Sequence, residues 1–178
     1  MIIKKTNFNG LIILKSKIFI DKRGFFKEVF KKKILKKSLR FDCLSYSKKN
    51  TIRGLHFQRK NPQAKFLTVV EGKIYDVAVD LRKNSKTFGK YFDIIIKSDS
   101  NFSIYIPEGF AHGFACLSKS CTLYYRCTNY RHKGSETTLK WNDPDLKINW
   151  KIKNPIISEK DSKGLFFSEI KKNKFFFN

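Results

Sequence analysis

Short runs of β-branched and aromatic residues, each ended by turn-forming residues, are the feature that most limits how this chain can fold. They predict strands at residues 11–14, 18–20, 66–70, 74–81, 91–96, 103–106, 109–117 and 121–128. The run at 74–81 is the most regular, because Tyr75, Val77 and Val79 alternate with polar or small residues as in a strand. Many short strands separated by Gly, Pro, Asn and Asp are typical of a β-sandwich or β-barrel.

Two local predictions accompany these strands. Glu71-Gly72-Lys73 predicts a hairpin turn between strands 66–70 and 74–81. A helix is predicted over residues 29–39, because its apolar residues would share one face and its lysines the other. The regular pattern ends after Trp150, and residues 173–178 are expected to form a frayed or docked tail.

The charge of the chain raises the question of a nucleic-acid partner. The 178 residues carry a formal net charge of +23, and a basic surface of this size attracts nucleic acids. Only 7 of the 38 basic residues are Arg, however, whereas sequence-reading proteins depend on Arg for bidentate base contacts. The lysines are also scattered along the chain. We therefore interpret the charge as a solvated surface and predict no nucleic-acid partner.

Cysteine usage and hydrophobicity indicate the compartment. The chain has four cysteines: Cys43, Cys116, Cys121 and Cys127. None belongs to a C-x-x-C pair, and none has a histidine at zinc-finger spacing. Lys4 and Lys5 interrupt the N-terminal apolar residues, and no apolar run approaches the ~20 residues of a membrane span. We expect a reduced, cytoplasmic protein without a membrane partner.

Two of the three histidines lie in Gly-flanked strand segments. His56 belongs to Arg53-Gly-Leu-His-Phe-Gln58, and His112 lies in residues 106–114. Strand alternation places His56 and Gln58 on one face, which would form a polar patch inside a small barrel. A single such histidine is usually a hydrogen-bonded core residue, but two of them favour a functional site.

An imidazole suits acid–base chemistry near neutral pH, provided that a partner fixes its tautomer. The partner is usually a carboxylate, and the spacing leaves four candidates: Asp76, Asp80, Asp143 and Asp161. Tyr125 is a second candidate acid, because alternation places it on one face with Leu123 and Cys127. A core aromatic role fits this position equally well.

Several motifs occur in an order that resembles a known family. They are Arg53–Gln58 followed by Lys65, residues 71–82, 85–89 and 106–114, Trp141-Asn-Asp-Pro144, and Ser158-Glu-Lys-Asp161. Across residues 11–161 the chain resembles the dTDP-4-dehydrorhamnose 3,5-epimerases. The resemblance implies a mainly β fold, a cupin-type jelly-roll barrel with short helical additions. It implies one domain over 1–178, with a core at 11–161 and a C-terminal extension at 162–178, and a homodimer that exchanges N-terminal strands.

The resemblance also implies a reaction, the epimerisation of dTDP-4-dehydro-6-deoxy-D-glucose at C3 and C5 to dTDP-4-dehydro-L-rhamnose. Both carbons adjoin the C4 ketone, so the reaction needs a base, a group that stabilises the enolate oxygen, and a proton donor on the opposite face. By resemblance, His56 is the base and Asp161 its partner. Lys65 is the cation near the C4 oxygen, and Tyr125 is the proton donor.

The substrate-binding residues implied by the resemblance are Arg23, Glu28, Arg53, Gln58 and His112. No cofactor is implied, because the ketone itself stabilises the carbanion. No metal is expected either, since metal-binding cupins carry a second histidine where this chain has Gln58, and a neutral amide is a poor ligand.

Four positions depart from the family pattern. Phe41 and Cys43 stand where members usually carry Gln and Asn, Arg131 stands where Tyr is frequent, and Lys151 stands where Pro is usual. Phe41 and Cys43 keep two alternatives open beside the double epimerase: a mono-epimerase and a 3,4-ketoisomerase acting on a related nucleotide sugar. The net charge of +23 keeps open a third, a non-catalytic basic binding protein on the same barrel.

Overall fold

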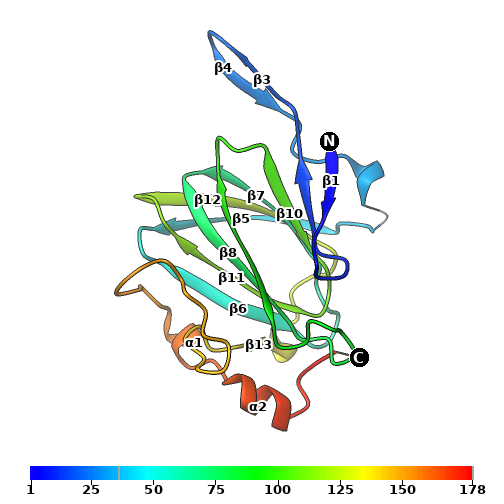
Figure 1. Ribbon diagram of the computed structural model, residues 1–178, viewed down its shortest axis with the longest axis vertical. Helices are drawn as coiled ribbons and strands as arrows, with labels where there is room; N and C mark the ends of the chain where they lie inside the picture. Colours follow the sequence, from blue (N-terminus) through cyan, green and yellow to red (C-terminus); the bar gives the residue numbers. More distant parts are fainter. Residues whose placement is uncertain (36, 178) are drawn as a thin grey trace.

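The computed structural model describes residues 1–35 and 37–177, and these form two antiparallel β-sheets that face each other (Figure 1). The larger sheet has the strand order β1 (Ile2–Lys5), β2 (Ile12–Lys15), β10 (Phe102–Ile106), β7 (Lys65–Glu71), β12 (Ser120–Cys127), β5 (Phe41–Lys48). The smaller sheet has the order β13 (Glu136–Thr138), β6 (Ile52–Gln58), β11 (Phe110–Cys116), β8 (Lys73–Asp80), β9 (Tyr91–Lys97). The predicted mainly β, jelly-roll architecture is confirmed.

Apolar side chains from both sheets fill much of the space between them. Leu67 and Leu123 of the larger sheet pack in one cluster with Ile74 and Phe114 of the smaller sheet. Burying a side chain of this size contributes about 1.5–3 kcal/mol. This cluster holds the two sheets together.

The C-terminal third of the chain covers the outer face of the smaller sheet. Tyr75 and Val77 of β8 point into a second cluster with Trp150 and Phe167, so this strand is buried on both faces. Two short helices, α1 (Glu159–Ser162) and α2 (Phe167–Lys172), lie at this side of the barrel (Figure 1). The tail is docked as far as Phe177, which bridges to Arg82; Asn178 lies outside the described residues.

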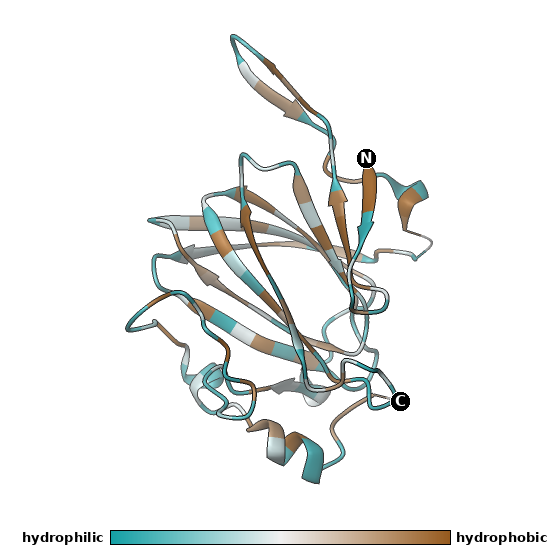
Figure 2. Cartoon of the chain, viewed as in Figure 1, coloured by the Kyte–Doolittle hydropathy of each residue, from teal (hydrophilic) through white to brown (hydrophobic). Residues whose placement is uncertain are grey.

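A hairpin projects away from the two sheets (Figure 1). Its strands, β3 (Ile18–Asp21) and β4 (Gly24–Lys27), pair with each other. Its large apolar side chains are exposed, by 81 % at Ile20 and 65 % at Phe26, and Figure 2 shows hydrophobic residues along it. Apolar side chains on a projecting hairpin are typical of a segment that packs against another chain.

The helix predicted over residues 29–39 is wrong. The structure has a single 3₁₀ turn, η1 (Lys32–Ile34), and Lys36 lies outside the described residues. Phe30 and Ile34 instead pack on the outer face of the larger sheet, beside Phe66. The closely spaced lysines of this segment would repel one another on a helix, and packing of the apolar residues on the sheet decides the conformation.

The hairpin predicted at Glu71-Gly72-Lys73 is also wrong. β7 pairs with β10 and β12, whereas β8 pairs with β11 and β9, so this turn carries the chain from one sheet to the other. Gly72 has φ +80°, and a Cβ atom there would lie 2.2 Å from the Ser120 carbonyl oxygen. The glycine is required by this close approach at a corner of the barrel.

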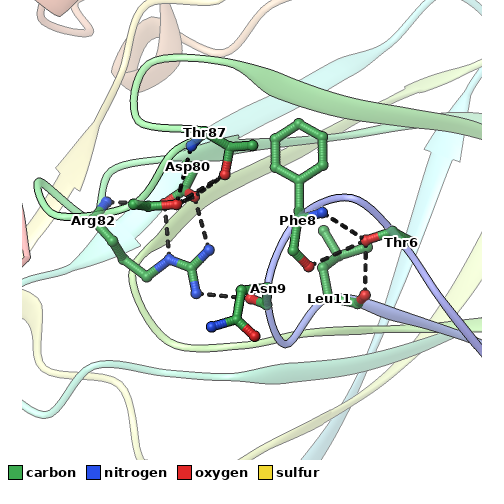
Figure 3. A network of polar contacts seen from close by, with 8 residues as sticks. Thr6, Phe8, Asn9, Leu11, Asp80, Arg82 and Thr87 are labelled. Atoms are coloured by element: carbon green, nitrogen blue, oxygen red, sulfur yellow. Dashed lines mark hydrogen bonds and ion pairs between the residues drawn. The ribbon is translucent and has the colours of Figure 1, made fainter.

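The motifs at 71–82 and 85–89 meet in a buried polar network (Figure 3). Asp80 accepts hydrogen bonds from the Arg82 guanidinium (2.7 and 2.8 Å), from Ser85 (2.7 Å) and from Thr87 (2.6 Å). Arg82 also donates to the Asn9 carbonyl oxygen (2.8 Å). These contacts lower the pKa of Asp80 in spite of its burial. The network fixes the loop after β8 to the N-terminal segment, which is a structural role.

Candidate active site

A pocket of about 370 Å³ opens between the two sheets. Five of the predicted site residues line it: Arg53, His56, Lys65, His112 and Tyr125. A second hollow of about 500 Å³ lies beside it and shares Arg53 and His56. The barrel therefore brings together residues that are far apart in the sequence, and His56 borders both spaces.

His56 is held by a carboxylate from the C-terminal segment. Its Nε2 lies 2.6 Å from Asp161 Oδ1, and the side chain of Asp161 is 4 % exposed. The other carboxylate oxygen accepts the backbone N–H of Gly54 (3.0 Å). Burial acts to raise the pKa of Asp161, but the bonds from His56 and Gly54 outweigh it and lower that pKa. An ionised carboxylate at Nε2 leaves Nδ1 as the ring nitrogen available to a substrate.

The motif Ser158-Glu-Lys-Asp161 explains how Asp161 is presented. Ser158 is the N-cap of α1, and its hydroxyl accepts the backbone N–H of Asp161 (3.1 Å). An N-cap serine satisfies an N–H group that has no partner within the helix. The short helix turn thereby fixes the backbone from which the carboxylate reaches β6.

Glycines allow β6 and β11 to come close behind the histidines. Gly54 has φ +109°, and a Cβ atom there would lie 2.6 Å from the His112 carbonyl oxygen. A Cβ atom on Gly113 would lie 2.6 Å from the Arg53 carbonyl oxygen. The glycine in Arg53-Gly-Leu-His56 is therefore needed for this approach and for the positive φ, and its backbone N–H binds Asp161.

The structure assigns each of the four candidate carboxylates a different partner. Asp161 binds His56, and Asp76 binds His112. Asp80 belongs to the corner network, and Asp143 accepts backbone N–H groups of the C-terminal segment, including that of Phe167 (2.6 Å). Contacts between distant parts of the chain decide which carboxylate reaches His56, so spacing in the sequence could not identify it.

His112 lies deeper in the pocket than His56. Its Nε2 is 2.8 Å from Asp76 Oδ2, and both side chains are almost fully buried. Burial lowers the pKa of His112, against the opposing effect of Asp76. Oδ1 of Asp76 is buried and has no hydrogen-bond partner among the described residues. The pair places a neutral imidazole and a polar carboxylate oxygen at the inner end of the site.

The opposite wall of the pocket is formed by three neighbouring strands of the larger sheet. Cys127 of β12 is the register partner of Lys65 on β7, and Tyr125 is the register partner of Cys43 on β5. The Tyr125 hydroxyl is 3.0 Å from Ser45 Oγ. Burial raises the pKa of Tyr125 and lowers the pKa of Lys65. This wall therefore presents a protonated phenol and a poorly solvated ammonium group.

Two substituted positions lie at the mouth of the pocket. The Phe41 ring stacks on Tyr130, with centroids 5.8 Å apart and planes at 21°. Arg131 donates to Glu136 Oε2 through Nε (2.8 Å) and Nη2 (2.6 Å). Both Phe41 and Arg131 line the pocket, so these departures from the family pattern change its rim rather than its catalytic walls.

Three predicted binding residues lie away from this pocket. Gln58 is buried, but its amide binds the backbone of Asn61, Tyr130 and His132, so it supports a loop and does not face a ligand. Arg23 and Glu28 belong to the projecting hairpin and the segment after it, and their side chains pair with Asp21 and Lys31. In residues 1–35 and 37–177 no group of three or more His, Cys, Asp or Glu side chains is arranged to hold a metal.

Sequence reasoning did not identify Ser45 as a residue of the site, and it named Asp76 only as one of four candidate partners for an imidazole. Ser45 binds Tyr125, and Asp76 binds His112. The alternation of strand 74–81 places the Asp76 side chain on the face opposite to Tyr75 and Val77. This was a signal in the sequence that could have distinguished Asp76. Ser45 carries no such signal, because its role depends on the register between β5 and β12.

Comparisons with known proteins agree with this geometry. A family model described as dTDP-4-dehydrorhamnose 3,5-epimerase matches residues 5–169. The chain belongs to this family. A relative named dTDP-4-dehydrorhamnose 3,5-epimerase, from Methanothermobacter thermautotrophicus, is 42 % identical over 165 residues, which cover 88 % of this chain and 89 % of the relative.

Solved structures of family members have the same fold. The dTDP-4-dehydrorhamnose 3,5-epimerase of Elizabethkingia anophelis has a TM-score of 0.89 and 39 % identity, over 95 % of this chain and 97 % of that one. The dTDP-6-deoxy-D-glucose-3,5-epimerase of Legionella pneumophila, solved in complex with dTDP-4-keto-L-rhamnose, has a TM-score of 0.90 and 35 % identity, over 96 % and 95 % of the two chains. The family resemblance inferred from the motifs is confirmed. Within the described residues, no helix has the length and hydrophobicity needed to span a membrane.

Proposed function

We propose that this chain is an isomerase that epimerises dTDP-4-dehydro-6-deoxy-D-glucose at C3 and C5, giving dTDP-4-dehydro-L-rhamnose. One observation carries the proposal. The base candidate His56, bound to Asp161, belongs to the smaller sheet, whereas Tyr125 belongs to the larger sheet, and both line one pocket. Inversion of a carbon requires a base and an acid on opposite sides of the sugar, and the two sheets provide two opposite walls.

The reaction begins when Nδ1 of His56 removes the proton from the carbon next to the C4 ketone. The electron pair of the broken C–H bond forms a C=C bond to C4, and the π electrons of the ketone move onto the C4 oxygen as negative charge. Asp161 stabilises the resulting imidazolium, and the ammonium group of Lys65 stabilises the enolate oxygen. Burial leaves the charge of Lys65 poorly solvated, which lowers its pKa and strengthens its interaction with a developing anion.

The enolate is then protonated on its other face by the Tyr125 hydroxyl, which inverts the carbon. A raised pKa keeps this phenol protonated until the enolate forms, and Ser45 orients it. The same steps at the second α-carbon complete the double epimerisation. Protons exchange with solvent between the two events, so deuterium from heavy water enters both positions.

The diphosphate of the substrate requires cations at the pocket mouth. Arg53 lies there, with Nε bound to Ser47 (2.8 Å) and Nη2 bound to the Tyr46 carbonyl oxygen (2.9 Å). A guanidinium fixed in this way presents its remaining N–H groups in a planar arrangement that suits phosphate oxygens. His112 lines the sugar end of the pocket.

Arg23 and Glu28 would then reach the pocket of a second chain, and we propose a homodimer for this reason. The hairpin that carries Arg23 projects from the barrel, and its apolar residues are exposed. Exposed apolar side chains on β5, such as Leu44 (66 %) and Tyr46 (57 %), offer a surface near the mouth of the pocket. Packing of one chain's hairpin on the other's β5 would bury both sets.

The decisive experiment follows hydrogen exchange by NMR. The protein is incubated in deuterated water with the dTDP-linked 4-keto-6-deoxyglucose, and C3 and C5 are monitored. Deuterium at both carbons supports the proposal, whereas exchange at one carbon selects the mono-epimerase and a 3-keto product selects the ketoisomerase. Binding of the nucleotide without exchange would leave only the non-catalytic binding protein. The variant Lys90→Met, which removes an exposed charge, controls for preparation effects.

Subunit complementation tests the homodimer and the place of Arg23. Arg23→Ala and His56→Ala chains are mixed after each is shown to be inactive or weak alone. If Arg23 serves the partner's pocket, each mixed dimer has one intact site, and a random mixture recovers about a quarter of the wild-type activity. No recovery in mixtures that are shown to exchange subunits would assign Arg23 to the pocket of its own chain.

We also infer that the enzyme acts in the cytoplasm. All four cysteines are free thiols, which fits a reducing compartment. The large positive charge is then a surface property that favours capture of an anionic nucleotide sugar.

A further inference from the structure

Two cysteines lie together on the wall of the pocket, next to the groups proposed to act on the substrate. Cys43 on β5 is the register partner of Tyr125, and Cys127 follows Tyr125 by two residues on β12. Because side chains two residues apart share a face, both thiols point to the side that carries the Tyr125 hydroxyl. Both cysteines line the pocket together with Lys65.

The two thiols differ in character. The neighbouring Cys127 thiol, together with the nearby charge of Lys65, lowers the pKa of Cys43 to about 7 despite partial burial. The presence of Cys43 and burial raise the pKa of Cys127. Cys43 thus has the properties of an attacking thiolate, and Cys127 those of a protonated neighbour on the adjacent strand.

The exposure of Cys43 and the position of its strand also favour a reaction between these two cysteines. Cys43 is exposed, whereas Cys127 is 4 % exposed and sits behind it. β5 is the edge strand of the larger sheet in the described part of the chain, so it is hydrogen-bonded on one side, to β12. Cys43 and Cys127 are diagonal neighbours on these adjacent strands, and closure requires β5 to shift toward β12 until the two sulfur atoms reach bonding distance.

We propose that Cys43 and Cys127 form a peroxide-reactive dithiol that closes to a disulfide on the wall of the substrate pocket. The Cys43 thiolate attacks a hydroperoxide, the O–O bond breaks, and Cys43 becomes a sulfenic acid while the peroxide leaves as water after taking up a proton. The Cys127 thiol then attacks this sulfur, and a second water leaves. Overall, two thiols are oxidised and one hydrogen peroxide is reduced to two waters.

Closure of the disulfide would inhibit the enzyme, and this consequence rests on the proposed function. It would remove the thiols that adjoin Lys65 and would pull β5 toward β12 beside Tyr125. The acid and the enolate-stabilising cation would both be displaced. Reduction by a small dithiol would restore the original wall.

The thiol chemistry is tested first, without any substrate. The full-length protein is treated with hydrogen peroxide, and its thiols are mapped by mass spectrometry. The proposal expects a loss of two hydrogens, a peptide that links Cys43 to Cys127, and free thiols at the fully buried Cys116 and Cys121, which serve as the internal control. Persistence of the Cys43 thiol, or its conversion to sulfinic acid without a link to Cys127, would overturn it.

Two variants sharpen this test, and neither requires a change in fold. In Cys127→Ala the sulfenic acid of Cys43 has no resolving thiol, so peroxide should drive it to the sulfinic acid. In the same variant, which also removes the donor beside Cys43, alkylation of Cys43 by iodoacetamide should show a higher pH midpoint than the value of about 7 expected for the wild type. An unchanged midpoint would show that Cys127 does not activate Cys43. Cys43→Ser should leave Cys127 reduced.

Activity is measured second, as deuterium exchange after peroxide and again after dithiothreitol, with each variant compared with its own untreated sample. The wild type should lose most of its exchange activity and regain it on reduction. Cys43→Ser should retain its own activity through the treatment. If the disulfide forms but the untreated protein shows no exchange, the proposed function fails and the dithiol proposal stands. If exchange is present and no disulfide forms, the dithiol proposal fails and the proposed function stands.

Discussion

His56 and His112 are direct register partners on β6 and β11, yet each is bound to a different carboxylate. The His56 side chain is 29 % exposed and borders both hollows, whereas that of His112 is 4 % exposed and faces Asp76. Neighbouring histidines on one sheet face can therefore have separate functions. The accessible one suits proton transfer, and the buried one suits shaping of the sugar pocket.

Asp161→Asn should reduce exchange at both carbons by a factor of about 10²–10⁴ without unfolding the protein. The amide oxygen can still accept the Gly54 N–H, but the amide nitrogen would donate to His56 Nε2 and place the ring proton on Nδ1, where a base needs a lone pair. The measurement is kcat for solvent deuterium incorporation. Glu159→Gln, on the same helix turn with its side chain 82 % exposed, is the matched control and should remain active. Full activity of Asp161→Asn would exclude the carboxylate from the mechanism.

His112→Gln should flatten the dependence of stability on pH. Burial lowers the pKa of His112 below its ordinary value of 6.5, so the unfolded chain binds a proton that the folded chain does not. The folded state therefore loses stability as the pH falls below about 6.5, and it regains that stability as the pH rises. Urea unfolding at about pH 7.5 and about pH 5.5 measures the effect. An equal change in unfolding free energy in the wild type and the variant would show that His112 is not responsible.

Lys65→Met should separate activity from stability. Removing a cation that stabilises a developing oxyanion costs a factor of about 10²–10³ in kcat. Because burial lowers the pKa of Lys65, its charged form is held at a cost, and an apolar side chain of similar length should unfold at the same or a higher temperature. Thermal unfolding and exchange kinetics are measured on one preparation, with Lys90→Met as the control for loss of an exposed charge. A large fall in Tm would point to a structural role for the ammonium group.

Gly54→Ala should destabilise the protein and disturb the dyad. Its Cβ atom would meet the His112 carbonyl oxygen at 2.6 Å, and its φ of +109° is unfavourable for alanine. Gly24→Ala is the matched control, since Gly24 has φ +128° and no atom within 4 Å of an added Cβ. The difference between the two variants isolates the steric clash, which should be about 1–3 kcal/mol in unfolding free energy. Equal effects would mean that the strands can separate at no cost.

Much of the barrel could be predicted from local patterns. The strands at 74–81 and 121–128 lie within about a residue of β8 and β12, because alternation and turn residues are local properties. The direction of the His56 side chain, into the barrel, followed from strand alternation as well. The helix at 29–39 failed because packing on the larger sheet outweighs local propensity, and the sequence does not reveal that surface.

The site itself depended on long-range pairing. Alternation could place His56 inside the barrel, but it could not choose Asp161 over Asp76, because that choice requires α1 to dock near β6. The family resemblance supplied the choice. Gln58 shows the opposite case: its direction was predicted, yet its amide is occupied by a loop that alternation says nothing about. The register of three strands, which brings Cys43, Cys127 and Lys65 together, was likewise not visible in the sequence.

The dyad joins residues that are 105 positions apart, and this separation has a consequence for protein synthesis. While the ribosome is still producing the segment that carries Asp161, His56 lacks the carboxylate that sets its tautomer. A nascent chain with both sheets complete would therefore be able to bind the nucleotide sugar but would be poorly equipped to convert it. If Asp161 serves His56 as proposed, catalytic activity should appear only once α1 has been translated and docked, so in a translation reaction the onset of turnover would mark the end of folding rather than the formation of the barrel.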